Sequence, residues 1–258
     1  MATPFFPSLI YEIHMPEQVR FYGFKPDKII VLTNYIKKEL VAAGFIENNI
    51  LISPDGVDIE KFDLKTTKGE ARNMVGLPLN KKIILYSGSF YMYGWKGIDV
   101  LLDAAGFLGD DCLIVLLGGK ENEIAEIKNK YELNNIFLIK QKPHAEVPYY
   151  LRSADVLVLP NKKGDEISEK YTSPLKLFEY MASGTPIVAS DLPSIREVLN
   201  KNNYILVESD NSKDLAQSIK EAMRDRDLAD RISKQALGDV QNYTWEKRAE
   251  GIVKFISQ

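Results

Sequence analysis

The sequence predicts an α/β protein built on a doubly wound parallel sheet. From residue 81 onward, short and almost continuously apolar runs alternate with segments that have the apolar spacing of helices. Strands with one solvent-exposed face alternate polar and apolar residues. These runs do not, so they are typical of strands covered on both faces. Helices supply this cover, because right-handed crossovers between parallel strands place them on both sides of the sheet.

Six expected strands lie in residues 82–209, and a helix follows each of them. The strands are KIILYSG, CLIVLLGG, NIFLIK, DVLVLP, TPIVAS and YILVES, and the helices are IDVLLDAAGFL, EIAEIKNKYEL, VPYYLRSA, SPLKLFEYMA, SIREVL and DLAQSIKEAMRD. Two more helices, RDLADRISKQALGDV and WEKRAEGIVKFIS, end the chain, and Thr244 is a suitable N-cap for the second. The carboxyl ends of the strands meet at one edge, where such folds bind ligands.

Upstream, the sequence predicts a small α/β remnant over residues 1–62. Its expected elements are the strands LIYEIH and KIIVLT, the helix YIKKELVAAGF and the strand and turn NILISPDGVD. Residues 55–76 have no sustained apolar period, so we expect residues 63–79 to connect the remnant to a main domain over residues 80–258. The last helix, residues 245–257, is expected to pack back on the N-terminal part.

Composition limits the classes of function. The formal charge of -3 argues against a protein that binds nucleic acid in general. The one cysteine, Cys112, lies in an apolar run and favours a buried residue in a reducing, cytoplasmic compartment. No apolar run is long enough to span a bilayer, and residues 1–16 make a poor signal peptide. No pair of histidines, cysteines or carboxylates has metal-ligand spacing, so no metal site is expected.

The run YTSPLKLFEYMASGTPIVASD contains a helix start at the ligand-binding edge. Ser173 is expected to cap this helix with its hydroxyl, and Pro174 to occupy its first position. Free N–H groups and a positive dipole end suit a phosphate there, and Lys176 adds a charge one turn in. Glu179, nearly two turns down, is placed to accept from both hydroxyls of a ribose. Periodicity alone favours the plainer alternative of a capping serine and a solvated carboxylate.

Two further loops at the same edge are candidates for phosphate contact. In YSGSFYMYGWKGIDV, Gly88 leaves room for close backbone approach beside Ser89, and Lys96 opens the next helix. In LLGGK, Gly118 and Gly119 follow the second strand. Each loop alone is equally well an ordinary turn between a strand and a helix. Three such loops on one edge favour a nucleoside diphosphate cleft more than any one of them does.

Both histidines follow expected strands. His144 either lines a base pocket or caps the helix that begins near Ala145. His14 ends the strand LIYEIH and therefore lies at a carboxyl-terminal strand end. A lone histidine is usually structural, but this is also the placement that a catalytic histidine would have. No GxSxG or other hydrolase signature accompanies either residue.

Several motifs, in their order and spacing, resemble those of one family. The chain is similar to the retaining, nucleotide-sugar-dependent glycosyltransferases of the GT-B fold, family 4. The residues that carry the similarity are IIVLTNYIKKELVAAG, NILISPDGVDIEKF, ILYSGS with WKGIDVLLDA, LIVLLGG, PYYLRSADVLVLPN, SPLKLFEYMASGTPIVASDLPSIREVL and TWEKRAEGIVKF. They extend from about Lys28 to the end of the chain.

The resemblance implies a donor-binding domain from about Asn80 onward. Its loop glycine, Gly88, would cradle the donor's diphosphate together with Lys96, the backbone from Ser173 to Leu175 would approach it, and Glu179 would bind the ribose. The family histidine that contacts the transferred sugar and phosphate corresponds to His14, which with Lys96 would be catalytic. No cofactor or metal is expected beside the nucleoside diphosphate sugar, because lysine and the helix dipole neutralise the leaving group.

Three features depart from the family pattern. Ser89 stands where an arginine is usual, and Tyr171 stands where the first glutamate of an EX7E pair is usual. Members with the SPLKxFEYMA variant also lack that glutamate, so the change is expected to alter sugar contacts without abolishing transfer. Two glutamates of the preceding loop, Glu166 and Glu169, are candidate substitutes. The N-terminal part is also shorter than the family's acceptor domain.

The expected function is that of a retaining hexosyltransferase. It would move a sugar from a nucleoside diphosphate sugar to a glycan or lipid-linked acceptor in surface polysaccharide assembly. The alternative is a nucleotide-sugar binding module, or a donor subunit that is inactive without an acceptor-binding partner. A sugar-nucleotide epimerase is a weaker interpretation, because it needs acid and base groups from both halves. Expected partners also include a second copy or an acceptor-domain subunit, in the cytoplasm or at the inner membrane face through the acceptor.

Overall fold

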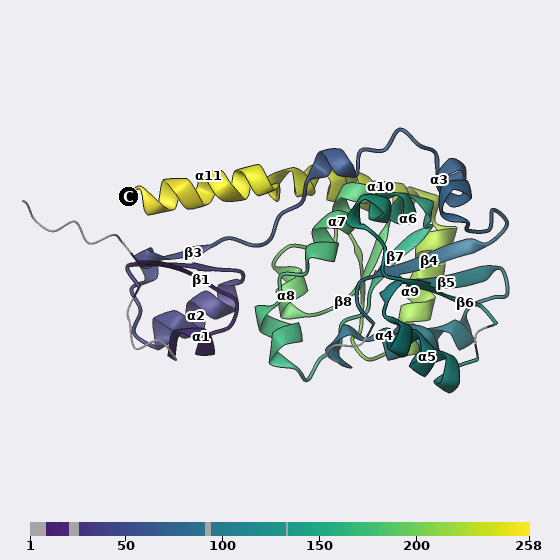
Figure 1. Cartoon of the computed structure of the whole chain (residues 1–258), viewed down its shortest axis with the longest axis horizontal. Helices are drawn as coiled ribbons and strands as arrows, with labels where there is room; N and C mark the ends of the chain where they lie inside the picture. Colours follow the sequence, from purple (N-terminus) through teal and green to yellow (C-terminus); the bar gives the residue numbers. More distant parts are fainter. Residues whose placement is uncertain (1–8, 21–25, 91–93, 133) are drawn as a thin grey trace, which may run out of the picture.

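Two parallel sheets organise the chain, and each belongs to a separate unit (Figure 1). The computed structural model describes residues 9–20, 26–90, 94–132 and 134–258. Within these residues the larger sheet has the strand order β6-β5-β4-β7-β8-β9, and the smaller one has the order β1-β2-β3. Figure 1 places the smaller sheet and the larger unit at opposite ends of the molecule.

The larger sheet is doubly wound, as the sequence predicts. Its strands are β4 (Lys82–Ser87), β5 (Cys112–Gly119), β6 (Ile136–Lys140), β7 (Val156–Leu159), β8 (Ile187–Ser190) and β9 (Ile205–Val207). Every neighbouring pair is parallel. The order runs outward from β4 on one side and from β7 on the other, so the topological switch point lies between these two strands. Open sheets of this kind bind ligands at that point.

Helices cover both faces of the larger sheet. On one face, Ile83 and Leu85 of β4 pack with α6 (Val147–Ser153), α7 (Leu175–Ser183) and α10 (Arg226–Asp239). On the other, Ile84 and Tyr86 pack with α4 (Ile98–Ala104), α5 (Glu121–Lys130) and α9 (Ser212–Arg224). Successive strand residues point to opposite faces, so a continuously apolar strand contributes side chains to an apolar core on each face of the sheet. The four-residue helix α8 (Pro193–Arg196) follows β8.

The smaller sheet has an apolar cluster of its own. Its elements are β1 (Ile10–Ile13), α1 (Glu17–Arg20), β2 (Lys28–Val31), α2 (Asn34–Ala42) and β3 (Ile50–Ile52). All of its strand pairs are parallel. One member of the cluster, Tyr171, comes from the larger unit and ties the two units together.

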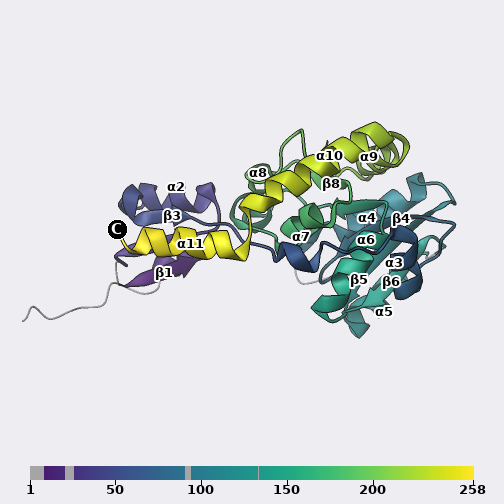
Figure 2. The ribbon, with the colours of Figure 1, turned by 90° about the horizontal axis from the view of Figure 1, so that it is seen from above.

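The last helix, α11 (Trp245–Ile256), runs from the larger unit alongside the smaller sheet (Figures 1 and 2). Lys28 of β2 donates a hydrogen bond from Nζ to the carbonyl of Phe255. Arg248 contacts the smaller unit twice, through Glu12 Oε1 at 2.8 Å and the carbonyl of Pro54 at 3.0 Å. The two ends of the chain therefore contribute to one unit.

Two segments cross between the units side by side. Val57 forms a parallel bridge with Thr244, and its N–H donates to the carbonyl of Tyr243 at 2.9 Å. The approach requires a glycine before the bridge, because a Cβ on Gly56 would lie 2.9 Å from the backbone nitrogen of Trp245. The two segments that connect the units are thus held together by close backbone contact.

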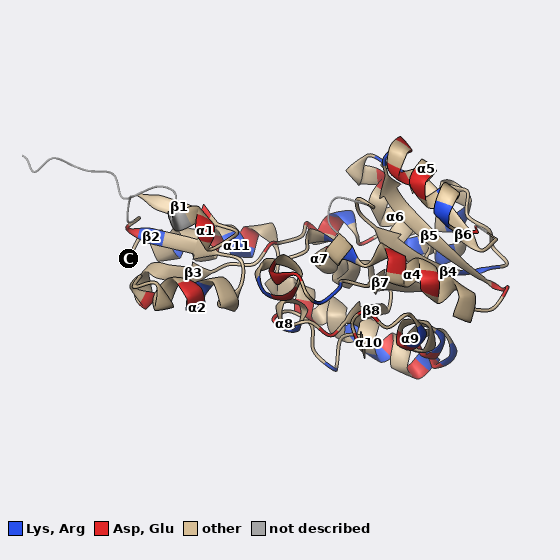
Figure 3. Ribbon diagram, turned by 90° about the horizontal axis from the view of Figure 1, so that it is seen from below, with Lys and Arg blue, Asp and Glu red and all other residues tan. Residues whose placement is uncertain are grey.

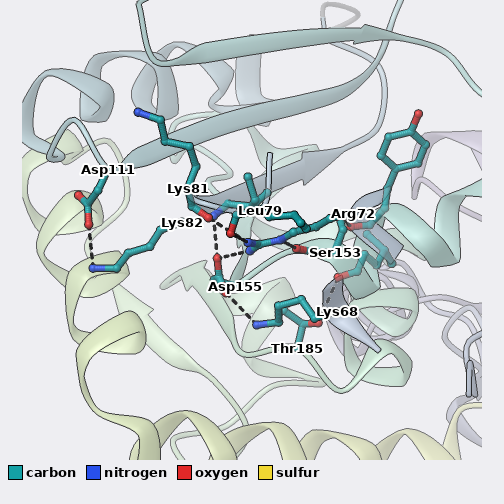
Figure 4. Close-up of polar contacts among 12 residues, drawn as sticks. Lys68, Arg72, Leu79, Lys81, Lys82, Asp111, Ser153, Asp155 and Thr185 are labelled. Atoms are coloured by element: carbon teal, nitrogen blue, oxygen red, sulfur yellow. Dashed lines mark hydrogen bonds and ion pairs between the residues drawn. The ribbon is translucent and has the colours of Figure 1, made fainter. Parts of the chain in front are cut away.

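One helix departs from the sequence prediction. Residues 55–76 do not form an irregular connector throughout, because α3 (Lys68–Val75) begins there with a capping box between Thr67 and Glu70. Its buried Arg72 donates to Asp155 at 2.6 Å and to the carbonyl of Ser153 at 2.9 Å (Figure 4). The buried guanidinium attaches this helix together with only two apolar residues, the buried Ala71 and the core-packed Val75, so its apolar period is weak.

Charge is mixed over the surface of both units. Figure 3 shows acidic and basic residues interspersed along the helices of both units. In the described part of the chain, none of the helices combines the length and the apolar character that a membrane crossing needs.

Candidate functional site

A cleft of about 770 Å³ lies at the carboxyl ends of β4 and β5 and reaches the smaller unit. Most of the predicted site residues line it: His14, Gly88, Ser89, Gly118, His144, Tyr171, Ser173, Leu175, Lys176 and Glu179. The predicted residues Lys96, Gly119 and Pro174 are not among the lining residues. The topology thus gathers loops that are distant in sequence, as the sheet-edge argument predicts.

The loops after β4 and β5 touch at two glycines. Gly88 has φ 132° and Gly118 has φ 120°, a region that residues with a Cβ rarely adopt. A Cβ on Gly118 would lie 2.6 Å from the carbonyl oxygen of Gly88. The next glycine serves packing instead, since a Cβ on Gly119 would lie 2.2 Å from the ring of Phe90. Two open backbone segments therefore form one wall of the cleft.

The start of α7 differs from the prediction. The helix begins at Leu175 with Pro174 at the N-cap, and no side chain caps it. The hydroxyl of Ser173 instead accepts a hydrogen bond from the backbone N–H of Asp55, at 3.0 Å. Ser173 therefore links the two units, and the first-turn N–H groups of α7 have no side-chain acceptor. A helix N-terminus of this kind attracts an anion.

Two lysines lie beside the glycine loop. Lys176 donates from Nζ to Tyr86 Oη at 2.7 Å, and burial lowers its pKa to about 7. Lys96, although outside the lining residues, donates from Nζ to Oγ of Ser89, which does line the cleft. Burial lowers the pKa of Lys96 as well. Burial therefore disfavours the charged forms of both lysines, and an anion beside them would favour those forms.

Glu179 and His144 form a pair at the cleft wall. Nε2 of His144 lies 2.7 Å from Oε1 of Glu179. The imidazole also packs edge-on against the ring of Phe62, with 6.4 Å between the ring centroids. Of the two sequence interpretations of His144, the cap of the next helix is wrong, because α6 has no side-chain cap hydrogen bond. The carboxylate of Glu179 thus lines the cleft with one of its oxygens engaged by the imidazole.

Tyr171 acts mainly as a contact between the units. It lies in a turn of π-helix (Ile167–Tyr171), is 4% exposed, and donates from its hydroxyl to Glu39 Oε1 of α2 at 2.6 Å. The two candidate substitutes for the missing glutamate are engaged elsewhere. Glu166 pairs with Lys170, and Glu169 accepts from the backbone N–H of Gly164. Neither lines the cleft.

The smaller unit contributes a histidine and a carboxylate. His14 is exposed to the cleft, and its Nε2 lies 3.2 Å from Glu12 Oε1. Asp55, which the sequence interpretation treated only as part of a turn, also lines the cleft. Burial raises the pKa of Asp55, and the nearby Arg248 and His14 partly oppose that effect. Its position after β3 was the available signal, since carboxyl ends of parallel strands carry ligand-binding residues.

No group of three or more histidine, cysteine, aspartate or glutamate side chains suited to a metal ion occurs in the described ranges. The polar groups at the cleft include Lys120, Lys142 and Lys176, the N-terminus of α7, the paired Glu179 and, from the other unit, His14 and Asp55. This set can hold an anion at one end and hydroxyl groups at the other.

The chain is similar to known proteins over most of its length. The family model of glycosyl transferases group 1 matches residues 67–238. Phosphatidyl-myo-inositol mannosyltransferase of Mycobacterium leprae is 30% identical over 205 residues, which are 78% of this chain and 51% of that protein. D-inositol 3-phosphate glycosyltransferase of Xylanimonas cellulosilytica is 24% identical over 246 residues, 90% of this chain and 57% of that protein. The chain spans about half the length of these curated relatives.

Solved structures share the architecture. Anabaena Alr3699/HepE, in complex with UDP and glucose, has a TM-score of 0.80 at 17% identity and covers 96% of this chain and 71% of its own. Sucrose-phosphate synthase (tll1590) from Thermosynechococcus elongatus has a TM-score of 0.78 at 21% identity. The match covers 99% of this chain and 68% of that protein chain. The fold is accordingly the Rossmann-like α/β fold of GT-B proteins. With the family model matching most of its length, the chain belongs to the group 1 glycosyl transferases.

Proposed function

We propose that the chain binds a nucleoside diphosphate sugar in the cleft and transfers the sugar, a hexose, with retention, as the family 4 resemblance implies. The observation that carries the proposal is the joint placement of Lys176, the N-terminus of α7 and Glu179 along one wall of a single cleft. Their order along the helix matches the order of diphosphate and ribose in such a donor. The solved neighbour bound to UDP and glucose supports this choice of ligand class.

Each group has a defined task in this scheme. The backbone at Gly88 approaches the diphosphate, and the cations of Lys96 and Lys176 stabilise the negative charge that grows on it as the glycosidic bond breaks. Glu179 accepts from the ribose hydroxyls and so fixes the nucleoside. From the opposite wall, His14 contacts the sugar and the phosphate nearest to it. We propose that these groups suffice without a metal ion.

Retention requires that the acceptor hydroxyl attack from the face that the nucleoside diphosphate leaves. In this arrangement the departing phosphate oxygen takes the proton of the acceptor hydroxyl as the new bond forms. The acceptor side of the cleft is the smaller unit, where His14 and Asp55 lie. Asp55 is placed to orient a hydroxyl of the sugar or of the acceptor.

For the acceptor we propose a glycan or lipid-linked sugar of surface polysaccharide assembly, met in the cytoplasm or at the inner membrane face. The relatives include a phosphatidyl-myo-inositol mannosyltransferase and a putative teichuronic acid biosynthesis glycosyltransferase of Bacillus subtilis. The first name refers to a lipid acceptor and the second to the synthesis of a polymer. A second copy or an acceptor-domain subunit as partner stays a prediction.

The test is transfer of radiolabelled hexose from UDP-glucose or GDP-mannose into a bacterial lipid extract, followed by NMR of the product's anomeric proton. An α-linked product from an α-linked donor supports the proposal. A β-linked product contradicts retention. Donor binding without transfer under all conditions, including added cell extract, would assign the chain to binding alone.

A further inference from the structure

Tyr86 holds Lys176 in place from two directions. The tyrosine lies near the end of β4, and its ring is fully buried. Its hydroxyl accepts from Lys176 Nζ at 2.7 Å and donates to the carbonyl of Ser89 at 3.2 Å. The same Nζ lies 4.1 Å from the centre of the tyrosine ring, within the range of a cation–π contact. One side chain therefore connects the cation to the loop that follows β4.

This arrangement places the ammonium directly over the loop glycine. Nζ of Lys176 lies 2.8 Å from the position that a Cβ on Gly88 would occupy. A larger residue there would displace the lysine, and Ser89, the next residue, carries no charge. The Tyr86 hydroxyl and the Gly88 backbone thus confine the ammonium to the wall of the cleft.

Lys96 and Lys176 donate to the hydroxyls of Ser89 and Tyr86, and neither has a carboxylate partner in an ion pair among the described residues. The charged and titratable groups that influence Lys176 are Lys96, which opposes its charge, and Glu179 of its own helix, which favours it. Glu123 of α5 favours the charge of Lys96. A half-buried cation without a counter-ion is costly, and an anionic ligand removes that cost.

We propose that Tyr86 is a positioning residue that holds Lys176 over Gly88, and that Lys176 supplies, together with Lys96, the positive charge opposite the diphosphate of the donor. This rests on the proposed function. Ser89, the residue after Gly88, is uncharged, and the cation beside that glycine comes instead from Lys176 of α7.

A consequence is that donor binding takes up a proton. Burial holds the pKa of Lys176 to about 7, so above that pH most of the free protein carries a neutral amine there. A diphosphate beside the nitrogen favours the charged form and raises this pKa. The complex therefore gains a proton from the buffer, and affinity falls as pH rises above about 7. Tyr86 stays protonated throughout, because burial raises its pKa well above the ordinary value.

The experiment is calorimetric titration of the full chain with UDP and with UMP, in HEPES and in Tris at pH 8.0. The two buffers differ in ionisation enthalpy, so the difference in heat gives the number of protons taken up. For UDP on the unmodified chain we expect proton uptake approaching one. Lys176→Met should bind UDP about 10- to 100-fold more weakly, the usual effect of losing a charge-assisted contact, with much less uptake. UMP should lose less affinity.

Two further variants separate positioning from folding. Lys176→Arg should recover affinity but take up no proton, because a guanidinium stays charged. Tyr86→Phe keeps the ring and should weaken UDP binding about 5- to 10-fold, with altered proton uptake, through loss of one hydrogen bond. The control is Lys128→Met, which removes the same charge from an exposed position on α5 and should leave both quantities unchanged.

If UDP binds Lys176→Met and Tyr86→Phe as tightly as the unmodified chain, with equal heats in both buffers, the positioning proposal is overturned while the proposed function stands. If the unmodified chain binds neither UDP, GDP nor ADP, both are overturned. Should Tyr86→Phe fail to fold, the two Lys176 variants decide the matter, because their aliphatic stems preserve the packing.

Discussion

Nε2 of His144 lies 2.7 Å from Oε1 of Glu179, the carboxylate that we assign to the donor ribose. Both the imidazole and the ribose hydroxyls are therefore partners for one carboxylate. The histidine side chain is largely exposed, at 61%, whereas that of Glu179 is 16% exposed. The histidine is the more exposed member of the pair, so a bound nucleoside would either displace it or share the carboxylate with it.

Replacing this histidine should ease donor binding. His144 occupies Oε1 of Glu179 in the free protein, so a ribose hydroxyl has to compete with the imidazole for that oxygen. We expect His144→Ala to bind UDP a few-fold more tightly than the unmodified chain, because the carboxylate is then open to the ribose. Isothermal titration of both proteins with UDP checks this. Weaker binding by the variant would instead make His144 a direct contact of the base.

The contact between Tyr171 and Glu39 should stabilise the two units together. Tyr171→Phe removes a 2.6 Å hydrogen bond to a carboxylate and should lower the free energy of unfolding by about 1 to 2 kcal/mol, measured in urea. A double-mutant cycle with Glu39→Gln isolates the pair. Tyr171→Glu should destabilise more, because it places a second carboxylate in the apolar cluster beside Glu39. Unchanged stability in Tyr171→Glu would contradict this role.

The buried pair of Arg72 and Asp155 should set the acid stability of the larger unit. Burial would raise the pKa of Asp155, but bonds from Lys68, Ile83 and Arg72 outweigh it and leave the pKa below its ordinary value. The stability from this group is therefore present above the unfolded pKa of about 3.9 and lost as pH falls through the lower folded value. Urea unfolding between pH 7 and pH 3 measures this loss.

Arg72→Met should cost about 3 to 5 kcal/mol at pH 7, since it leaves the carboxylate of Asp155 short of a buried partner. The matched control is Lys82→Met, which breaks the exposed pair with Asp111 drawn in the same view (Figure 4) and should change stability little. Equal effects of the two substitutions would mean that burial does not govern the Arg72 pair.

Gly118 should be required for the geometry of the cleft wall. Gly118→Ala forces a Cβ to within 2.6 Å of the Gly88 carbonyl at a positive φ, so the two loops must separate. We expect a loss of about 1 to 3 kcal/mol in stability and weaker UDP binding. Gly106→Ala, with open space around its Cβ position, is the control and should bind UDP normally. Normal binding by Gly118→Ala would show that the loops need not touch.

The sequence predicts the larger sheet well, because apolar period is a local property. Each run such as CLIVLLGG became a strand, and the strand ends placed Gly88, Gly118 and the start of α7 in one cleft. Helix α3 was not predicted, because few of the residues that attach it are apolar and one of them is the buried Arg72, although the capping box of Thr67 and Glu70 was readable in the sequence.

The contacts between the two units could not be predicted from local sequence patterns. Ser173 has the composition of a cap, yet its hydroxyl meets the N–H of Asp55 from the other unit. Tyr171 stands next to the helix that lines the cleft, yet its ring lies in the cluster of the smaller sheet. Such pairings depend on how two units meet, which neither periodicity nor spacing encodes.

The central claim is that Glu179 holds the nucleoside of a nucleoside diphosphate sugar in this cleft. The most direct test is calorimetric titration with UDP, GDP and ADP and their sugar conjugates, for the unmodified chain and for Glu179→Ala. We predict that one nucleotide binds the unmodified chain and that the variant loses at least about tenfold in affinity, the usual cost of losing charge-assisted hydrogen bonds. Equal binding by both proteins, or binding of no nucleotide by the unmodified chain, would contradict the account.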